Sequence, residues 1–242
     1  MVRSVVFGPD GKRIVSGSYD KKVKVWDAQT YECLKTFEEH TDIVFTVEFS
    51  PSGDRIVSGG RDDKVMVWVT ETGEMSFELS AEAGDVKSVR FSPDGKSIVS
   101  SHTGENAVYV WNSETGQKIY SLEGQKVNVD NVAVTPDGKQ FVTTAETVAV
   151  WDAETGEEIH DFGGGNSPLR SLTISPEGKR IAVGFRSGEI RIWDARPESR
   201  SGGVSTVLDW FLSVGVVFML LGVLGRGMVK SPRALIGIGG VL

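Results

Sequence analysis

Three side chains in the first third of the chain have the types that nucleophilic hydrolysis uses. Ser58 carries a hydroxyl, His40 a base and Asp62 a carboxylate that can orient an imidazole. The same residue types can also form a structural hydrogen-bond network, and the resemblance described below implies that second role. On that basis we predict no catalytic residues and a chain that is not an enzyme.

The remaining chemistry-bearing residues also favour structural roles. One cysteine and three scattered histidines are too few for a usual zinc site, so we expect no metal and no cofactor. The run 163–166, Gly-Gly-Gly-Asn, opens no predicted helix and carries no Lys-Ser/Thr pair, which indicates a flexible loop rather than a phosphate loop. Paired acids such as Glu38-Glu39 and Glu157-Glu158 are typical of a solvated surface.

Composition and charge restrict the class of protein. The 242 residues are 39% hydrophobic, which is typical of a globular chain and excludes a disordered, collagen-like or disulfide-stapled one. The formal charge is −7, and because residues 197–242 hold four basic and two acidic side chains, residues 1–196 carry −9. Such an acidic body predicts no nucleic-acid partner. A lone Cys33 and a start without a secretory signal favour a cytoplasmic location.

Two markers recur with one period along the chain. Five of the six tryptophans are separated by 42, 43, 40 and 42 residues, and they lie at Trp26, Trp68, Trp111, Trp151 and Trp193. Prolines in Pro-Xaa-Gly turns keep nearly the same spacing, at Pro9, Pro51, Pro93, Pro136 and Pro176. A period of 40 to 45 residues predicts a tandem array of propeller blades.

Each repeat contains four short segments with the alternation of β-strands. In the second unit they are 44–49, 55–59, 65–68 and 75–79, separated by turn residues. Val and Ile are enriched and no helical period appears, so each unit predicts a small twisted antiparallel sheet.

The units resemble WD repeats, the Trp-Asp family of β-propellers, over residues 2–196. The signature dipeptide occurs at Trp26-Asp27, Trp151-Asp152 and Trp193-Asp194, with a variant at Trp111-Asn112 and a departure at Trp68-Val69. The resemblance implies an all-β propeller of five four-stranded blades and a scaffold that binds other proteins. The expected boundaries are blades at 2–42, 43–84, 85–124, 125–164 and 165–196, a linker at 197–203, an apolar segment at 204–225 and a Gly-rich tail at 226–242.

Both edges of the array predict an unfinished propeller. Val2 aligns with Val86, so the first unit starts inside its innermost strand, and 201–204 in the last unit does not have the pattern of an outer strand. Seven blades need roughly 290 residues at about 42 residues each. We expect an open, partial ring rather than a closed ring of five, with exposed apolar flanks that favour association.

The resemblance also implies a buried hydrogen-bond tetrad within each blade. The second unit matches all four family positions, with His40, Ser58, Asp62 and Trp68, and the first matches three, with Ser16, Asp20 and Trp26. The third unit has Glu82 and Glu105 at the His and Asp positions, the fourth has a turn two residues shorter, and the fifth has Val183 and Ser187 in place of Ser and Asp. Only the second blade is therefore expected to hold a complete tetrad.

Partners of the family often dock on the narrower top face, where the inner strands begin. The top-face positions of this chain carry five basic and two acidic side chains, which predicts a basic, partly aromatic rim for an acidic or phosphorylated protein segment. A random scatter of surface charge is the alternative. The predicted rim residues are Arg3, Tyr19, Ile43, Phe45, Arg61, Lys87, Asp130, Arg170 and Arg186.

Residues 204–225 form a largely apolar run whose only charged side chain is Asp209, and they have the length of a membrane span. Trp210 and the flanking Arg226, Lys230 and Arg233 fit such a span, but the charge bias then places the propeller outside the cytosol, which is unusual for the family. The alternative is a segment read through a changed frame or a retained intron. A membrane-tethered adaptor therefore stays open beside the untethered scaffold.

Overall fold

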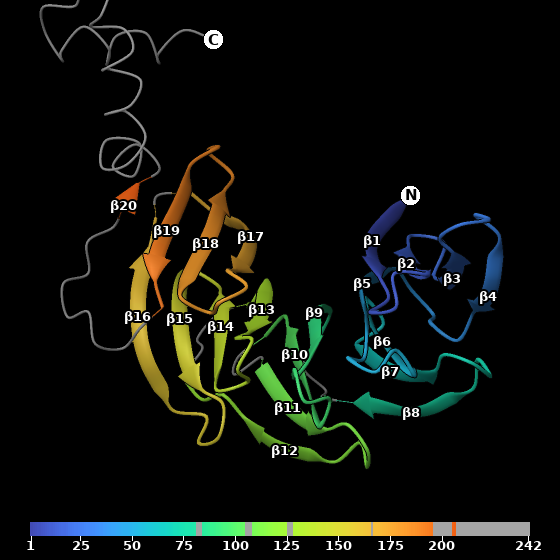
Figure 1. The fold of residues 1–242 in the computed structure, drawn as a ribbon. Coiled ribbons are helices and arrows are strands. Elements are labelled where there is room, and N and C mark those ends of the chain that lie inside the picture. The colour runs from blue at the N-terminus through green and yellow to red at the C-terminus, as the bar shows by residue number, and fades with distance from the viewer. Residues whose placement is uncertain (81–83, 105–107, 125–127, 166, 196–204, 207–242) are drawn as a thin grey trace, which may run out of the picture.

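The computed structural model describes residues 1–80, 84–104, 108–124, 128–165, 167–195 and 205–206, and these residues form strands and turns without a helix. The strands make five antiparallel sheets that stand around an arc, each with its first strand nearest the centre (Figure 1). We number these sheets as blades one to five in chain order. The all-β, blade-by-blade architecture predicted from the repeats is confirmed.

The strands alternate with short turns throughout. Blade one contains β1 (Val2–Phe7), β2 (Arg13–Ser18), β3 (Val23–Asp27) and β4 (Cys33–Phe37). Blade two contains β5 (Val44–Phe49), β6 (Arg55–Gly60), β7 (Lys64–Val69) and β8 (Met75–Ser80). Blade three contains β9 (Val86–Phe91), β10 (Ser97–His102), β11 (Val108–Asn112) and β12 (Lys118–Ser121). Blade four contains β13 (Asn131–Val134), β14 (Gln140–Thr144), β15 (Thr147–Asp152) and β16 (Glu158–Gly164). Blade five contains β17 (Leu169–Ile174), β18 (Arg180–Phe185), β19 (Ile190–Asp194) and β20 (Ser205–Thr206).

The core lies between neighbouring blades. The apolar side chains of each inner strand pack on the middle strands of the blade before it, so that Val44 and Val47 of β5 share one cluster with Val15 and Val23 of blade one. In the equivalent contact between blades two and three, Gly59 leaves room for the inner strand, because a Cβ atom there would lie 2.4 Å from Cγ1 of Val86. Apolar burial between sheets is the main favourable term that holds the blades together.

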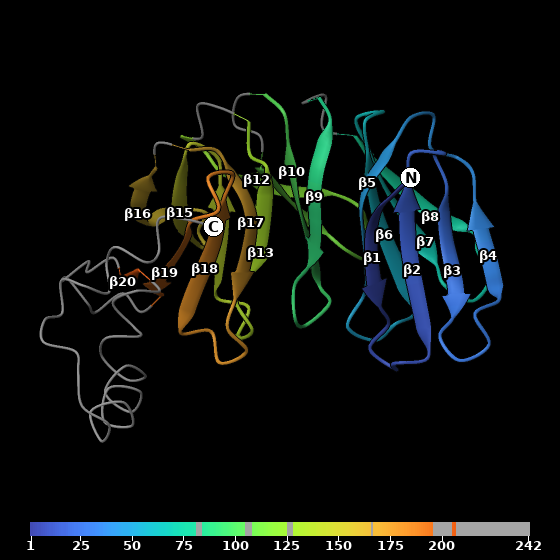
Figure 2. The same ribbon diagram turned by 90° about the horizontal axis from the view of Figure 1, so that it is seen from above.

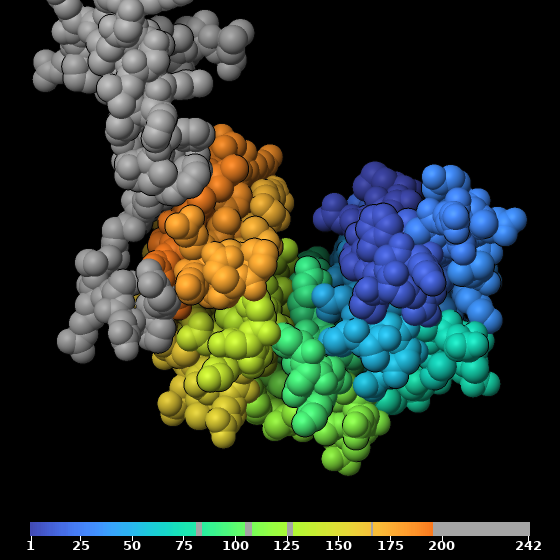
Figure 3. Space-filling view, viewed as in Figure 1, coloured from blue at the N-terminus to red at the C-terminus, as the bar shows by residue number. Residues whose placement is uncertain are grey.

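One such face is uncovered in the described structure. Val5 and Phe7 of β1 are 58% and 63% exposed, whereas Val47 and Phe49, which hold the same positions in β5, are 0% and 5% exposed. The space-filling view shows open space between blade one and blade five (Figure 3). The arc is therefore open, as the unfinished repeat pattern predicts.

The outer edge of blade five is short. Residues 201–204, where the sequence predicted no strand, lie outside the described residues, and the next two residues form β20, which pairs with β19 through Arg191↔Thr206 and Ile192↔Ser205. The Glu-Thr-Gly turn that precedes the outer strands of blades two, three and four is absent from the sequence between β19 and β20. The rest of the predicted linker, apolar segment and tail, 197–204 and 207–242, lies outside the described residues. Within the described part of the chain, no helix is long and apolar enough to cross a membrane.

Candidate functional site

The inner strands carry β-bulges close to the top face. The pairing of β1 with β2 shifts between Val2 and Ser4, and the pairing of β5 with β6 shifts between Val44 and Thr46. Equivalent shifts occur at Lys87 in β9 and at Arg170 in β17. A bulge turns the extra side chain away from the regular alternation, which is why bulges are common beside binding sites.

These bulges gather the central rim residues around one pocket. A cavity of about 340 Å³ on the top face is lined by Arg3, Phe45, Lys87, Asp130, Asn131, Leu169 and Arg170. The five residues that lie six positions before the repeat prolines thus come together from all five blades. Figure 2 shows the blades from the side, with the strand ends and their turns on two opposite faces.

Cations surround an aromatic ring in this top-face pocket. The Lys87 ammonium lies 4.6 Å from the centre of the Phe45 ring, and the Arg3 guanidinium carbon lies 5.9 Å from it. Lys87 also forms an ion pair of 2.9 Å with Asp85. A cation over an aromatic face is held by the ring's quadrupole, so the ring positions positive charge at the mouth of the pocket.

The other predicted rim residues stand around the pocket and do not line it. Tyr19 is 42% exposed. The backbone N–H of Arg61 donates to the carbonyl of Ile43 at 2.8 Å, and that of Arg186 donates to Pro168 at 2.8 Å. The exposed side chains of Arg61 and Arg186 thus lie on the loops at the periphery of the rim.

The four tetrad residues of blade two meet in a buried chain of hydrogen bonds. The Trp68 indole donates to Ser58 Oγ at 2.9 Å, Ser58 Oγ lies 2.8 Å from His40 Nε2, and His40 Nδ1 lies 2.9 Å from Asp62 Oδ2. The tautomer that satisfies every group has Ser58 donating to Nε2 and Nδ1–H donating to Asp62. Burial alone raises the pKa of Asp62, but the hydrogen bonds from His40 and from the N–H of Thr41 bring it below its usual value.

This geometry leaves Ser58 no room to act on a substrate. The side chains of His40 and Asp62 are 1% and 3% exposed, and Ser58 is 0% exposed. Both the proton and a lone pair of the hydroxyl are already used inside the blade. The arrangement joins strands and loops and lies far from open solvent, which is the geometry of a structural network.

Comparison with known families agrees with this fold. The family model "WD domain, G-beta repeat" matches residues 1–27, 31–69, 73–112 and 156–194, more than half of the chain. The chain belongs to the WD40-repeat family. WD40 repeats act in protein–protein interaction, so this chain is a scaffold of that class.

Individual relatives match only one stretch of the chain. The Ribosome biogenesis protein BOP1 homolog of Drosophila grimshawi is 50% identical over 44 residues, 18% of this chain and 6% of that protein. The homolog of the same name in Drosophila ananassae is 53% identical over 38 residues, 16% of this chain and 5% of that protein. The chain therefore spans about a twentieth of the length of these curated relatives.

Blade one contains only part of the hydrogen-bond tetrad. The Trp26 indole donates to Ser16 Oγ at 2.8 Å. Asp20 is exposed and accepts instead from the backbone N–H of Lys22 at 3.1 Å, within its own turn. The structure thus brings Ser16 and Trp26 together and places Asp20 outside their contact.

Blade three contains a network that sequence reasoning missed. Trp111 donates to Ser100 Oγ at 2.8 Å, Ser100 lies 2.8 Å from His102 Nε2, and His102 Nδ1 donates to the Gly84 carbonyl at 3.2 Å. Here the histidine comes from the middle strand β10 and not from the loop before the blade. The predicted Glu82 and Glu105 lie outside the described residues.

The signal for this substitution was present in the spacing. His102 follows Ser100 by two residues, where blade two has Ser58 and Gly60. A Cβ atom on Gly60 would lie 2.9 Å from His40 Nδ1, so the space above that strand position holds an imidazole in both blades. Burial lowers the pKa of His102 to about 4, which keeps it neutral near pH 7.

Blades four and five have progressively less of the network. Trp151 donates to Thr143 at 2.9 Å, a residue only eight positions earlier because the turn is two residues shorter. In blade five the buried Trp193 Nε1 has no partner among the described residues, since Val183 holds the hydroxyl position.

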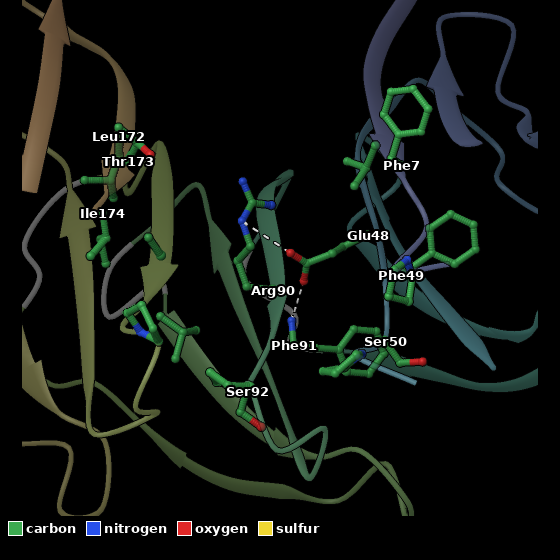
Figure 4. A pocket seen from close by; sticks show the side chains of 17 residues that line it. Phe7, Glu48, Phe49, Ser50, Arg90, Phe91, Ser92, Leu172, Thr173 and Ile174 are labelled. Carbon is green, nitrogen blue, oxygen red and sulfur yellow. Dashed lines mark hydrogen bonds and ion pairs between the residues drawn. The ribbon is translucent and has the colours of Figure 1, made fainter. Parts of the chain in front are cut away.

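A second cavity opens where the inner strands converge near the opposite face. It has a volume of about 470 Å³, and Glu48 and Arg90 stand on its wall (Figure 4). Glu48 Oε2 accepts from the N–H of Phe91 at 2.5 Å, and Oε1 lies 3.9 Å from Arg90 Nε. Burial raises the pKa of Glu48 to about 7 although Arg90 and the N–H of Phe91 oppose the shift. This pair joins the neighbouring inner strands β5 and β9 of blades two and three.

Proposed function

We propose that this WD40 protein is a non-catalytic scaffold that binds acidic or phosphorylated segments of partner proteins in the top-face pocket. The single observation that carries the proposal is the convergence of Arg3, Lys87 and Arg170 on one pocket, in which Arg3 and Lys87 lie against the ring of Phe45. Elsewhere the protein is acidic, so three cations at one pocket attract an anionic segment that the remaining surface repels.

The pocket offers two kinds of contact. Guanidinium groups bind carboxylate or phosphate oxygens through paired hydrogen bonds, and Arg3 and Arg170 are both exposed. Phe45 offers an apolar surface for the carbon atoms of the bound segment. Asp130 lines the same pocket and repels anionic groups of the ligand. The ligand should therefore bind with its anionic group turned away from Asp130.

Binding of a phosphorylated peptide, measured by calorimetry beside its unphosphorylated form, tests the proposal. Lys87→Glu and Arg170→Glu should each weaken binding at least tenfold, because each reverses a charge at the pocket. Lys179→Glu changes the net charge equally at an exposed residue beside the Pro176 turn, away from the rim, and serves as the matched control. Equal effects of all three variants would show that general charge, and not this pocket, attracts the ligand.

The cellular setting and location are further proposals. We infer a cytoplasmic adaptor from the lone cysteine and the composition. The brief similarity to proteins named for ribosome biogenesis suggests a role in such a complex as a second candidate, which recovery of ribosome assembly proteins with the full chain would support. For the membrane-tethered adaptor, equal solubility of the full chain and a version ending at residue 196 would exclude anchoring.

A further inference from the structure

The crevices between neighbouring blades, on the face opposite the top-face pocket, are filled by arginine in two cases. Arg13 of blade one lies with its guanidinium carbon 5.6 Å from the Phe49 ring of blade two. Arg55 holds the same repeat position in blade two and lies 5.9 Å from the Phe91 ring of blade three. Arg55 also donates to the backbone carbonyl of Ser113 in blade three. Each guanidinium thus lies in the seam between its own blade and the next.

The crevice between blades three and four lacks this arginine. Ser97 occupies the repeat position of Arg13 and Arg55, and its short side chain leaves a cavity of about 700 Å³. The cavity is also lined by Phe141 and Ala153, and Ala153 holds the repeat position of Ser113. The repeat position of Phe49 and Phe91 is Val134 in blade four, so the aromatic ring of this seam comes from a different strand position, at Phe141. The seam therefore offers an aromatic ring and the repeat equivalent of Ser113, without an arginine of its own.

The walls of this crevice are acidic. Four carboxylates line it against the single cation Lys139, and they belong to Asp94, Asp137, Asp152 and Glu154. Hydrogen bonds from Ser92 and Thr135 hold the pKa values of Asp94 and Asp137 below their usual range, and backbone N–H groups of Thr155 and Glu154 do the same for Asp152. These groups are anionic at neutral pH, and an empty cavity of this charge attracts a cation.

We propose that the crevice between blades three and four binds an arginine side chain of a partner protein, in the place that Arg13 and Arg55 fill in the preceding seams. The guanidinium suits the site because it packs on apolar and aromatic surface while its N–H groups bind carboxylates and carbonyls. This site is separate from the top-face pocket and attracts ligands of the opposite charge. The proposal for either site can therefore be refuted while the other stands.

The test uses N-acetyl-arginine methylamide, with N-acetyl-citrulline methylamide as a neutral probe of nearly the same shape. Binding to the full chain is followed by NMR at the backbone amides of Gly138, Glu154 and Thr155, the last two of which donate to Asp152. We expect saturable shifts with the arginine probe and at least tenfold weaker binding of the citrulline probe. Equal binding of the two probes would overturn the proposal.

Two variants confine the effect to this crevice. Ser97→Arg supplies the missing arginine from within the chain and should abolish binding of the probe, while unchanged binding would overturn the proposal. Arg55→Ser empties the preceding seam and should add a second set of shifts at Gly95, the repeat equivalent of Gly138. If Ser97→Arg does not fold, Asp94→Asn combined with Asp137→Asn replaces it and should weaken binding at least tenfold.

Discussion

Ser58 joins two buried polar groups inside blade two, so its removal should lower the unfolding free energy more than removal of a serine with one such partner. Ser58→Ala leaves the Trp68 indole and His40 Nε2 buried without this partner, and each lost partner costs roughly 1 to 3 kcal/mol. Ser16→Ala strands only the Trp26 indole, which is less buried, and is the matched control. Urea unfolding should give a clearly larger loss of unfolding free energy for Ser58→Ala; similar losses would contradict the network.

Glu48 makes the stability of the protein depend on pH. Because burial raises the pKa of folded Glu48 from 4.5 to about 7, the neutral carboxyl contributes stability below about pH 4.5 that is lost as the pH rises through 7. Glu48→Gln keeps an acceptor for the N–H of Phe91 and never ionises. Between pH 5 and pH 8, the unfolding free energy of the variant should therefore rise by on the order of 1 to 3 kcal/mol relative to that of the natural protein.

Urea unfolding of both proteins at the two pH values measures this difference. Contributions from other titrating groups cancel, because both proteins share them. Parallel stability profiles would mean that Glu48 stays ionised and paired with Arg90 throughout this range.

At the scale of elements, the packing of one blade on the next depends on glycine in the second strand. Gly59→Ala places a Cβ atom 2.4 Å from Val86 Cγ1, so the two sheets must separate, at a cost of roughly 1 to 3 kcal/mol. Val86→Ala removes the clashing methyl groups. The double variant should therefore lose less unfolding free energy than the sum of the losses of the two single variants. A double-mutant cycle by urea unfolding measures this coupling. If the two losses of unfolding free energy simply add, the alanine Cβ atom at position 59 does not clash with Val86.

The elements themselves follow from local patterns in the repeats. Alternating Val and Ile with Pro-Xaa-Gly turns predict four strands per unit, because strand period and turn chemistry act over a few residues. His102 could not be assigned in this way. Its role depends on which side chain fills the space above β10, and that space lies between a strand and a loop 18 residues apart.

At the scale of the whole molecule, the open arc exposes an apolar face on blade one. Val5→Lys places charge at a position that is 58% exposed and should change the unfolding free energy by less than about 0.5 kcal/mol. Val47→Lys places the same charge at the equivalent buried position of blade two and should prevent folding. Thermal denaturation separates the two.

The same variant reports on association through this face. Val5→Lys should also lower binding of a hydrophobic dye and self-association in light scattering, since both need exposed apolar surface. Unchanged dye binding would show that this face is covered in solution.

The sequence by itself determined the number of blades, their strands and turns, and the residue types of the blade-two network. These features depend on periodicity and on spacing inside one repeat, which local sterics and burial set. Only the tertiary structure decided that one residue from each of five blades meets in the top-face pocket, that His102 replaces a loop histidine, and that Ser97 leaves an acidic crevice. Those outcomes depend on which side chains of different blades occupy the same space. The distances between blades are set only when the whole arc has folded.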